Sequence, residues 1–416
     1  MSLNAVQAKA VTHPKNVRLQ LWGVSLMAFL WTMSSFMVFS ILPMFLTDEL
    51  GANLRQVGNL EGIASFTAFF MKFFSGIVSD IFRSRIGILA MGTALTSAAK
   101  LLFACATGIG GVFMARFIDR LSKGIRAAPA DAIIADLSSQ PMRGQSYGLR
   151  QSLMSLGAVC GAVIASSMLA HTSNNYRLIF ACATLPAALS LVVLFTMVRT
   201  PSPNSALVNK SQSKPFAFTS FFTMPTLYWV TLALLNILMF ARFSESFVLY
   251  RARDIGWTKN WLPYIFGIIN CVHAVCAYPA GILADRIGKI RMAIMGLIVL
   301  ITANLIIIYA NTPESMGIGI MLIGVEMAMT HSTLKATISD LLPAHARGTG
   351  FSLIALSTGL TLYASNALAG ECAHSYGTFA PFVVGTFAAS IAIIGFLILH
   401  RFQLKKGNLP SERIKG

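Results

Sequence analysis

Six ionisable side chains stand within one apolar segment and form the densest candidate chemistry in the sequence. On a helix that turns by about 100° per residue, all six fall within a sector of roughly 140°. Since an ionised side chain facing lipid is costly, this face is predicted to meet water, protein or substrate. Four bases against two acids favour binding of an anion, which guanidinium groups hold in a forked geometry. The six residues are Arg116, Asp119, Arg120, Lys123, Arg126 and Asp131.

A purely structural charge network is the alternative to anion binding on this segment. Asp119 stands three residues after Arg116 and four before Lys123. At these spacings side chains are neighbours on a helix, so the stripe can neutralise itself in part. Both interpretations place the stripe inside the protein.

Further ionisable residues interrupt other apolar segments, and five of them are candidates for the site. Arg242 and Glu245 are predicted to pair locally at i,i+3, and Arg242 and Lys335 join the four bases of the stripe as substrate contacts. Asp119 and Glu245 would orient the bases or accept a proton. Glu61, Glu326 and Asp131 are further candidates for proton coupling, with structural pairing as the alternative for Glu61 and Glu326.

Helices that cross a membrane must position these side chains. Of the 416 residues 55% are hydrophobic and 11% are charged, with a mean hydropathy of +0.69, whereas soluble proteins carry about 25% charged residues. Crossing the hydrocarbon layer takes about 20 helical residues. We therefore expect an all-α membrane protein. Its twelve predicted helices span 19–46, 54–80, 86–107, 109–138, 143–170, 176–198, 224–252, 260–284, 290–310, 316–342, 347–370 and 377–401.

The net charge of +17 does not indicate a nucleic-acid partner, because the bases lie in the two tails and in alternate loops. This positive-inside pattern predicts cytoplasmic termini, with anionic membrane lipids as partners of the loops. One group, Arg251, Arg253 and Lys259, falls on the predicted outer side and is an exception.

The two halves of the chain repeat each other. Gly76–Asp80 and Gly281–Asp285 match at an offset of 205 residues, and Arg143–Leu149 matches Arg347–Leu353 at 204. A gene duplication and two pseudo-symmetric six-helix bundles follow. The predicted boundaries are 1–18 for a cytoplasmic tail, 19–198 for the first half, 199–223 for a cytoplasmic linker, 224–401 for the second half and 402–416 for a basic tail.

The segment from Gly281 to Lys289 resembles the loop signature of the major facilitator superfamily. The first-half copy keeps part of the signature but has Phe82-Arg83-Ser84 where a glycine turn is expected. The resemblance implies the fold of that superfamily, transport by alternating access, and gating of the cytoplasmic side by the two loops. The gating residues it implies are Gly76, Asp80, Arg85, Gly281, Asp285, Arg286, Gly288 and Lys289.

A weaker resemblance involves Gly148, Gly157 and Gly161, whose spacing is similar to the antiporter signature of the same superfamily. Ala162 stands where that signature has proline. The glycines favour export slightly, and close helix packing explains them equally well.

These observations predict an inner-membrane secondary active transporter, a proton-coupled symporter or antiporter for a small organic anion or zwitterion. Carboxylates, phosphorylated metabolites and carboxylate siderophores fit equally. No enzymatic motif is present, the six cysteines lack metal-ligand spacing, and we expect a monomer without cofactor or metal. One rival is a multidrug/proton antiporter for lipophilic compounds, and another is a membrane sensor that transports nothing.

Overall fold

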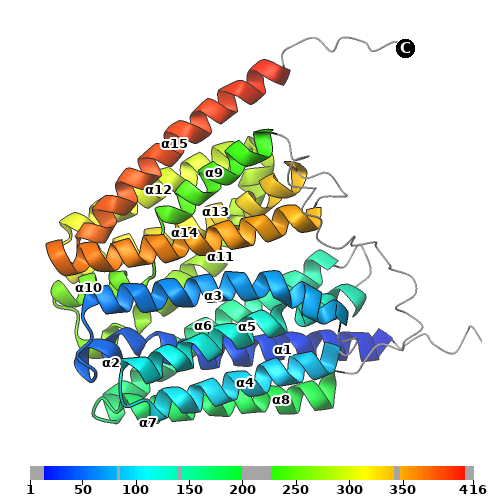
Figure 1. Cartoon of the computed structure of the whole chain (residues 1–416), viewed down its shortest axis with the longest axis vertical. Coiled ribbons are helices and arrows are strands. Elements are labelled where there is room, and N and C mark those ends of the chain that lie inside the picture. Colours follow the sequence, from blue (N-terminus) through cyan, green and yellow to red (C-terminus); the bar gives the residue numbers. More distant parts are fainter. Residues whose placement is uncertain (1–13, 82–84, 138–142, 199–225, 342–346, 408–416) are drawn as a thin grey trace, which may run out of the picture. The chain divides into compact units, whose positions relative to one another are not determined.

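The computed structural model describes residues 14–81, 85–137, 143–198, 226–341 and 347–407. Their regular structure is helical throughout (Figure 1). The predicted linker, and the outer parts of both predicted tails, lie outside the described residues. The all-α fold class predicted from composition is confirmed.

Within each sequence half, the helices follow one another along the chain with short connections. Those of the first sequence half are α1 (Pro14–Phe39), α2 (Leu42–Asp48), α3 (Leu54–Ile81), α4 (Arg85–Cys105), α5 (Ile109–Leu137), α6 (Arg143–His171), α7 (Tyr176–Cys182) and α8 (Thr184–Met197). Those of the second are α9 (Thr226–Phe240), α10 (Ser246–Asp254), the 3-10 turn η5 (Lys259–Trp261), α11 (Tyr264–Ile287), α12 (Lys289–Tyr309), α13 (Pro313–Leu341), α14 (Arg347–Tyr376) and α15 (Ala380–Gly407).

Three predicted helices are interrupted. The segment 19–46 divides into α1 and α2, where Pro43 occupies the first turn of the second piece. The segment 176–198 divides into α7 and α8, and 224–252 divides into α9 and α10. Proline fits a first helical turn because it lacks an amide hydrogen. No glycine or proline accompanies the interruption after α9, so its cause must lie in tertiary contacts.

Within the described residues, eight helical stretches are long and apolar enough to cross a membrane, and α9 is a shorter apolar helix. The 29-residue α5 is long enough as well, but the charged stripe lowers its hydropathy. Several membrane-crossing segments in one chain make this a multi-pass membrane protein.

The chain divides into two compact units, which we describe separately. The first comprises 1–53, 63–216 and 258–267, and the second comprises 54–62, 217–257 and 268–416. In the first unit, buried side chains of α1, α4, α5 and α8 form one apolar core, which includes Val24, Leu89, Ile133 and Leu194.

Helices α1 and α6 of the first unit pack against each other at glycine positions. A side chain on Gly157 would place its Cβ 2.5 Å from the carbonyl oxygen of Phe29, and Gly161 lies similarly close to the backbone at Met33. Small residues let helix backbones approach in this way. Close packing therefore accounts for these two glycines.

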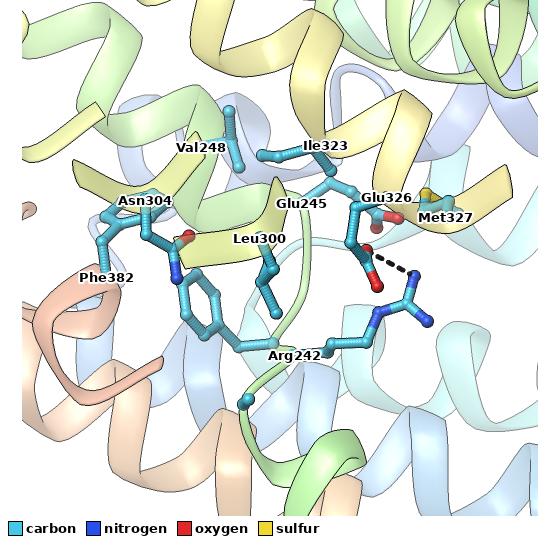
Figure 2. Close-up of a pocket in the computed structure, with 11 residues that line it drawn as sticks. Arg242, Glu245, Val248, Leu300, Asn304, Ile323, Glu326, Met327 and Phe382 are labelled. Atoms are coloured by element: carbon cyan, nitrogen blue, oxygen red, sulfur yellow. Dashed lines mark ion pairs between the residues drawn. The ribbon is translucent and has the colours of Figure 1, made fainter. Parts of the chain in front are cut away.

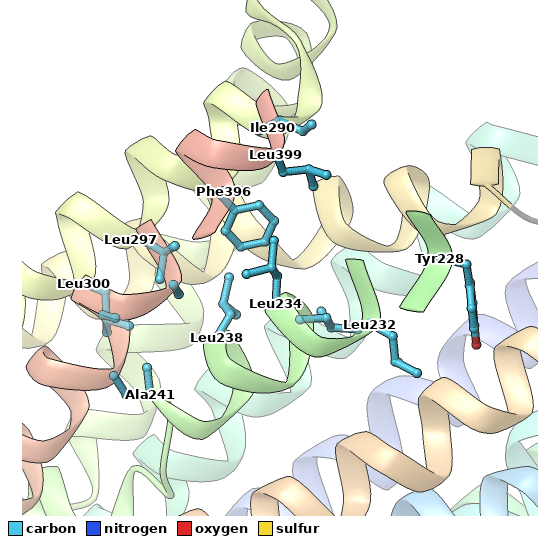
Figure 3. Close-up of a cluster of buried hydrophobic side chains, with 14 residues drawn as sticks. Tyr228, Leu232, Leu234, Leu238, Ala241, Ile290, Leu297, Leu300, Phe396 and Leu399 are labelled. Carbon is cyan, nitrogen blue, oxygen red and sulfur yellow. The ribbon is translucent and has the colours of Figure 1, made fainter. Parts of the chain in front are cut away.

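The second unit has its own core between α9, α12 and α15 (Figure 3). Leu234 and Leu238 of α9 meet Leu297 of α12 and Phe396 of α15 in this cluster. Leucine side chains from three helices thus fix the end of α9, and the chain leaves the helix directly after this anchored segment.

Candidate functional site

A buried ion pair joins two helices of the first unit. Lys100 Nζ of α4 lies 2.6 Å from Asp119 Oδ1 of α5, and both side chains are almost fully buried. The alternative of a purely structural charge network predicts that Asp119 pairs with Arg116 and Lys123 of its own helix. The lysine partner that the structure shows is Lys100, because α4 packs along the stripe and brings its own ammonium group to the acid.

The ring of Phe39, at the end of α1, gathers three cations. The guanidinium carbons of Arg116 and Arg120 lie 3.9 and 4.6 Å from the ring centroid, and Lys100 Nζ lies 5.2 Å away. The negative face of an aromatic ring attracts cations at such distances. We call Phe39, Lys100, Arg116, Asp119 and Arg120 the Phe39 cluster. Three bases and one acid give it a formal charge of +2.

Arg126 lies two turns after Asp119 on α5 and makes its own polar contacts. Its Nη1 donates to the hydroxyl of Thr96 on α4, and its guanidinium carbon lies 4.6 Å from the ring centroid of Trp31 on α1. The hydroxyls of Thr96 and Ser122 are 3.0 Å apart. Arg126 is only 6% exposed, so these contacts replace water around its charge.

The remaining two residues of the stripe are exposed. The side chain of Lys123 is exposed, and Asp131 forms an ion pair with Arg150 of α6. The stripe therefore divides into the Phe39 cluster, the Arg126 contact, a solvent-accessible lysine and an inter-helix ion pair. The prediction that this face meets water, protein or substrate agrees with the burial of Arg116, Asp119 and Arg126 inside the protein.

In the second unit, the chain between α9 and α10 leaves the helical conformation at 241–245. Ser365 of α14 donates its hydroxyl to the carbonyl oxygens of Phe240, at 2.8 Å, and Arg242, at 3.0 Å. Asn366 Oδ1 accepts from the amide of Ser244 at 2.7 Å. Non-helical backbone inside a membrane protein needs such partners, because lipid offers none.

This interruption overturns the predicted local pair between Arg242 and Glu245. Residues at i,i+3 face each other only on a helix. Arg242 instead reaches α13, where its Nη2 lies 3.3 Å from Glu326 Oε2 (Figure 2). Thr330 donates its hydroxyl to Glu326 Oε1 at 2.9 Å.

A small pocket of about 50 Å³ lies at the interruption between α9 and α10. Figure 2 shows Arg242 with Glu326, and Phe382 with the amide of Asn304. Asn304 Nδ2 and Glu326 Oε2 are buried and have no hydrogen-bond partner among the described residues. The pocket lining further includes Ala241, Phe243, Glu245, Val248, Leu300, Ile323 and Met327.

The other predicted site residues belong to further helices or loops, or have side chains outside the description. Glu61 of α3 is buried at 6% exposure. Arg286 and Gly288 are exposed, and Gly288 precedes α12 with a φ of +93°, which glycine adopts without strain. The side chains outside the description are those of Gly76, Asp80, Arg85, Asp285, Lys289 and Lys335.

Two bases of the group on the predicted outer side, Arg251 and Lys259, form hydrogen bonds or ion pairs in the structure. Arg251 donates to the carbonyl oxygens of Ile307, Ile308 and Ala310 at the end of α12, at 3.2, 2.9 and 3.2 Å. Lys259 Nζ lies 2.7 Å from Asp48 Oδ2 within the first unit. A basic side chain satisfies the last carbonyls of a helix in this way. These contacts give both bases a structural role.

Sequence reasoning missed several residues of these sites. Lys100 could have been found, because it is the one ionisable residue between Ile86 and Cys105. Ser365, Asn366 and Asn304 carry no comparable signal, since they bear no charge that would single them out within their segments. No group of metal-ligating side chains occurs among the described residues.

Long apolar helices with buried charges between them define a multi-pass membrane protein. The family model of the Major Facilitator Superfamily matches residues 24–272 and 248–414. The chain therefore belongs to this superfamily, and the resemblance proposed from the loop signature is confirmed.

Relatives and solved structures agree with this membership. An uncharacterised MFS-type transporter of Methanocaldococcus jannaschii is 26% identical over 378 residues, covering 89% of this chain and 92% of the relative. The multidrug resistance protein MdtH of an Enterobacter species is 22% identical over 331 residues, covering 78% of this chain and 79% of MdtH. The structure of a bacterial homologue of the human lysosomal transporter Spinster matches with a TM-score of 0.75 and 15% identity, over 95% of this chain and 99% of that one.

Proposed function

We propose that this MFS transporter carries a small organic anion or zwitterion across the cytoplasmic membrane, with protons as the coupling ion and both termini in the cytoplasm. The observation that carries the proposal is the Phe39 cluster. Its formal charge of +2 is held inside the first unit by helix packing. A positive site with low-dielectric walls concentrates and binds anions.

The two arginines of the cluster are the proposed anion contacts. Asp119 lies 2.6 Å from Lys100 within the same cluster. Arg116 and Arg120 lie over the ring of Phe39, which holds guanidinium groups in place. The three bases outnumber the one acid, and a carboxylate or phosphate would bind to guanidinium groups through bidentate hydrogen bonds. Lys123, exposed one turn after Arg120, is an entry contact for the same anion.

A thermal-shift screen of anionic solutes on the purified protein identifies the substrate, and flux in proteoliposomes tests it. We expect Arg120→Gln to abolish flux of that solute while the protein remains folded. Arg177→Gln is the matched control, because Arg177 forms a partly exposed ion pair with Glu49 away from the cluster. Unchanged flux in Arg120→Gln contradicts the anion assignment.

Proton coupling is tested separately in the same vesicles. If protons drive accumulation, collapse of the pH gradient by an ionophore stops it at constant membrane potential. Accumulation that persists without the gradient contradicts proton coupling and leaves exchange or another ion.

Export of lipophilic compounds is the second candidate function, favoured by the likeness to a multidrug resistance protein. It predicts resistance to several unrelated drugs when the protein is overproduced, and binding of uncharged compounds that Arg120→Gln leaves intact. The buried charges of the Phe39 cluster favour an anionic substrate instead, because a lipophilic compound would not offset the free-energy cost of removing these charges from water.

A further inference from the structure

Arg126 is a second buried guanidinium group of the charged stripe, and it lies outside the Phe39 cluster. Only 6% of its surface is exposed, and no acid lies within ion-pair distance of it among the described residues. Its direct contacts are with the neutral side chains of Thr96 and Trp31. A buried charge without compensation is strongly disfavoured in a low-dielectric interior. The described part of the chain therefore provides no direct counter-charge for Arg126.

The hydroxyl groups beside Arg126 cannot supply that counter-charge. Thr96 accepts from Arg126 Nη1 and donates its own proton to a backbone carbonyl oxygen of α4 at 3.0 Å. Ser122 donates to a backbone carbonyl oxygen of α5 at 2.7 Å. Both hydroxyls thus take part in neutral hydrogen bonds, and the ring of Trp31 offers only its quadrupole. An anion from outside the chain would supply the missing charge.

Two further N–H groups in the surroundings of Arg126 are buried and donate to nothing in the residues that the structure describes. They are Nε1 of Trp31 on α1 and Nε of Arg150 on α6. Trp31 contacts the guanidinium group of Arg126, and Arg150 lies within electrostatic range of it. Buried donors are nearly always satisfied in folded proteins. A carboxylate or phosphate, with several oxygen lone pairs, is the matching acceptor.

The other charges near Arg126 also favour an anion. Arg126 and Arg150 carry like charges, which repel each other. Asp131 pairs with Arg150, but its side chain is half exposed, so water screens its charge. Two bases and one acid leave a formal charge of +1 in this part of the first unit. One acidic group of a ligand would neutralise it.

The contacts of Arg126 and the Phe39 cluster are too far apart for one acidic group to reach both. Phe39 and Trp31 are eight residues apart on α1, and Arg120 and Arg126 are six residues apart on α5. At a rise of about 1.5 Å per residue, these spacings correspond to roughly 9–12 Å along the two helices. Lys123, between the two arginines of α5, is exposed, so water reaches the stripe there.

We propose that Arg126, together with the indole of Trp31, binds a second acidic group of the transported anion. The preferred substrate then carries two acidic groups separated by roughly 9–12 Å, the rise between the two contacts. α,ω-Dicarboxylates, and chains that carry a phosphate group at each end, belong to this class. Binding of the first group at the Phe39 cluster rests on the proposed function, whereas the missing counter-charge of Arg126 does not.

Isothermal titration calorimetry on the full chain in lipid nanodiscs tests the proposal without a transport measurement. The probes are α,ω-dicarboxylates from succinate to dodecanedioate and the corresponding α,ω-bisphosphonates. Each is compared with its half-ester, in which the acidic group at one end is blocked. We expect the best diacid to bind at least about tenfold more tightly than its half-ester, because a charge-assisted bidentate contact is lost in the ester. Affinity should peak at the chain length that reaches both contacts.

Two variants assign the second contact. Arg126→Gln should reduce binding of the diacid to the level of its half-ester and leave binding of the half-ester unchanged. Trp31→Phe keeps an aromatic face but removes the indole N–H, and we expect a loss of several-fold for the diacid alone. Arg177→Gln, which breaks a partly exposed ion pair with Glu49, is the control and should change neither affinity.

Equal binding of diacid and half-ester by the wild-type protein overturns the proposal, even if Arg126→Gln does not fold. Absence of binding by both series overturns it as well. Equal weakening of both ligands in a folded Arg126→Gln protein overturns it too, because it indicates a single acidic group at one site. Diacid binding that depends on Arg126 without flux in proteoliposomes contradicts the proposed function alone. Flux of a monoanion that Arg126→Gln leaves unchanged contradicts this inference alone.

Discussion

Lys100 of α4 and Asp119 of α5 form a buried ion pair, in which Nζ lies 2.6 Å from Oδ1. Asp119 makes this contact although Arg116 and Lys123 are nearer to it in the sequence. Asp119 is the central acid of the charged stripe. Arg116 and Arg120 of the same stripe lie over the ring of Phe39 on a third helix. The relationship between Lys100 and Asp119 therefore fixes one acid among the three cations that surround Phe39.

Loss of the lysine should destabilise the first unit strongly. In Lys100→Met the carboxylate of Asp119 stays buried without its ammonium partner, and we expect a loss of about 3–5 kcal/mol in the free energy of unfolding. Chemical denaturation in detergent, followed by tryptophan fluorescence, measures it. The double variant Lys100→Met, Asp119→Leu should recover most of the loss, because it removes both charges. Lys123→Met, at an exposed lysine, should change the stability by less than about 0.5 kcal/mol. Equal effects at both lysines would contradict the buried pair.

The ring of Phe39 should matter through its contact with cations. Phe39→Leu keeps an apolar side chain but removes the aromatic face, which is worth about 0.5–2 kcal/mol for each nearby cation. We expect a raised KM for the transported anion, with restoration in Phe39→Tyr. Flux in proteoliposomes measures both.

Phe36→Leu is the control for that experiment. Phe36 lies on the same helix and contacts the rings of Phe39 and Phe266. If both leucine variants raise KM equally, general packing rather than the cation contact explains the effect.

The side chains that hold the interruption after α9 should control the position of Arg242. Asn366→Ala leaves the amide of Ser244 without its acceptor, a cost of about 1–3 kcal/mol. We expect flux to fall by about tenfold, which corresponds to roughly 1.4 kcal/mol. Thr361→Val is the matched control, because Thr361 contacts Asn236 of α9 one turn away, within regular helix.

A double-mutant cycle separates positioning from general packing. If Asn366 acts through Arg242, Asn366→Ala should cause little further loss of flux in an Arg242→Gln background. Additive losses in the double variant would show instead that Asn366 supports the fold independently of Arg242.

Close packing of α1 and α6 predicts different outcomes for two glycines of one helix. Gly157→Ala places a methyl group 2.5 Å from the carbonyl oxygen of Phe29, and overpacking of this kind costs about 1–3 kcal/mol. Nothing lies within 4 Å of the corresponding position at Gly148. Thermal unfolding should therefore shift downward in Gly157→Ala and slightly upward in Gly148→Ala, because alanine favours a helix over glycine by about 0.5–1 kcal/mol. Equal tolerance at both positions would contradict the close approach of the two helices.

Sequence reasoning located the helices well because hydropathy is a local property. The limits of α4, predicted as 86–107 and observed as Arg85–Cys105, differ by at most two residues. It failed at 224–252, where the interruption at 241–245 contains no glycine or proline that would signal a break in the helix. The partners that open the helix there come from α14, more than a hundred residues away, and no local pattern records them.

The sequence by itself determined the membrane class, the duplicated halves, the superfamily and the segment that carries the charged stripe. These features follow from composition, periodicity and repeats, which need no knowledge of neighbouring helices. Only the tertiary structure decided that Asp119 pairs with Lys100 and that Arg242 pairs with Glu326. An ion pair depends on which helix faces pack together, and packing is a property of the folded chain.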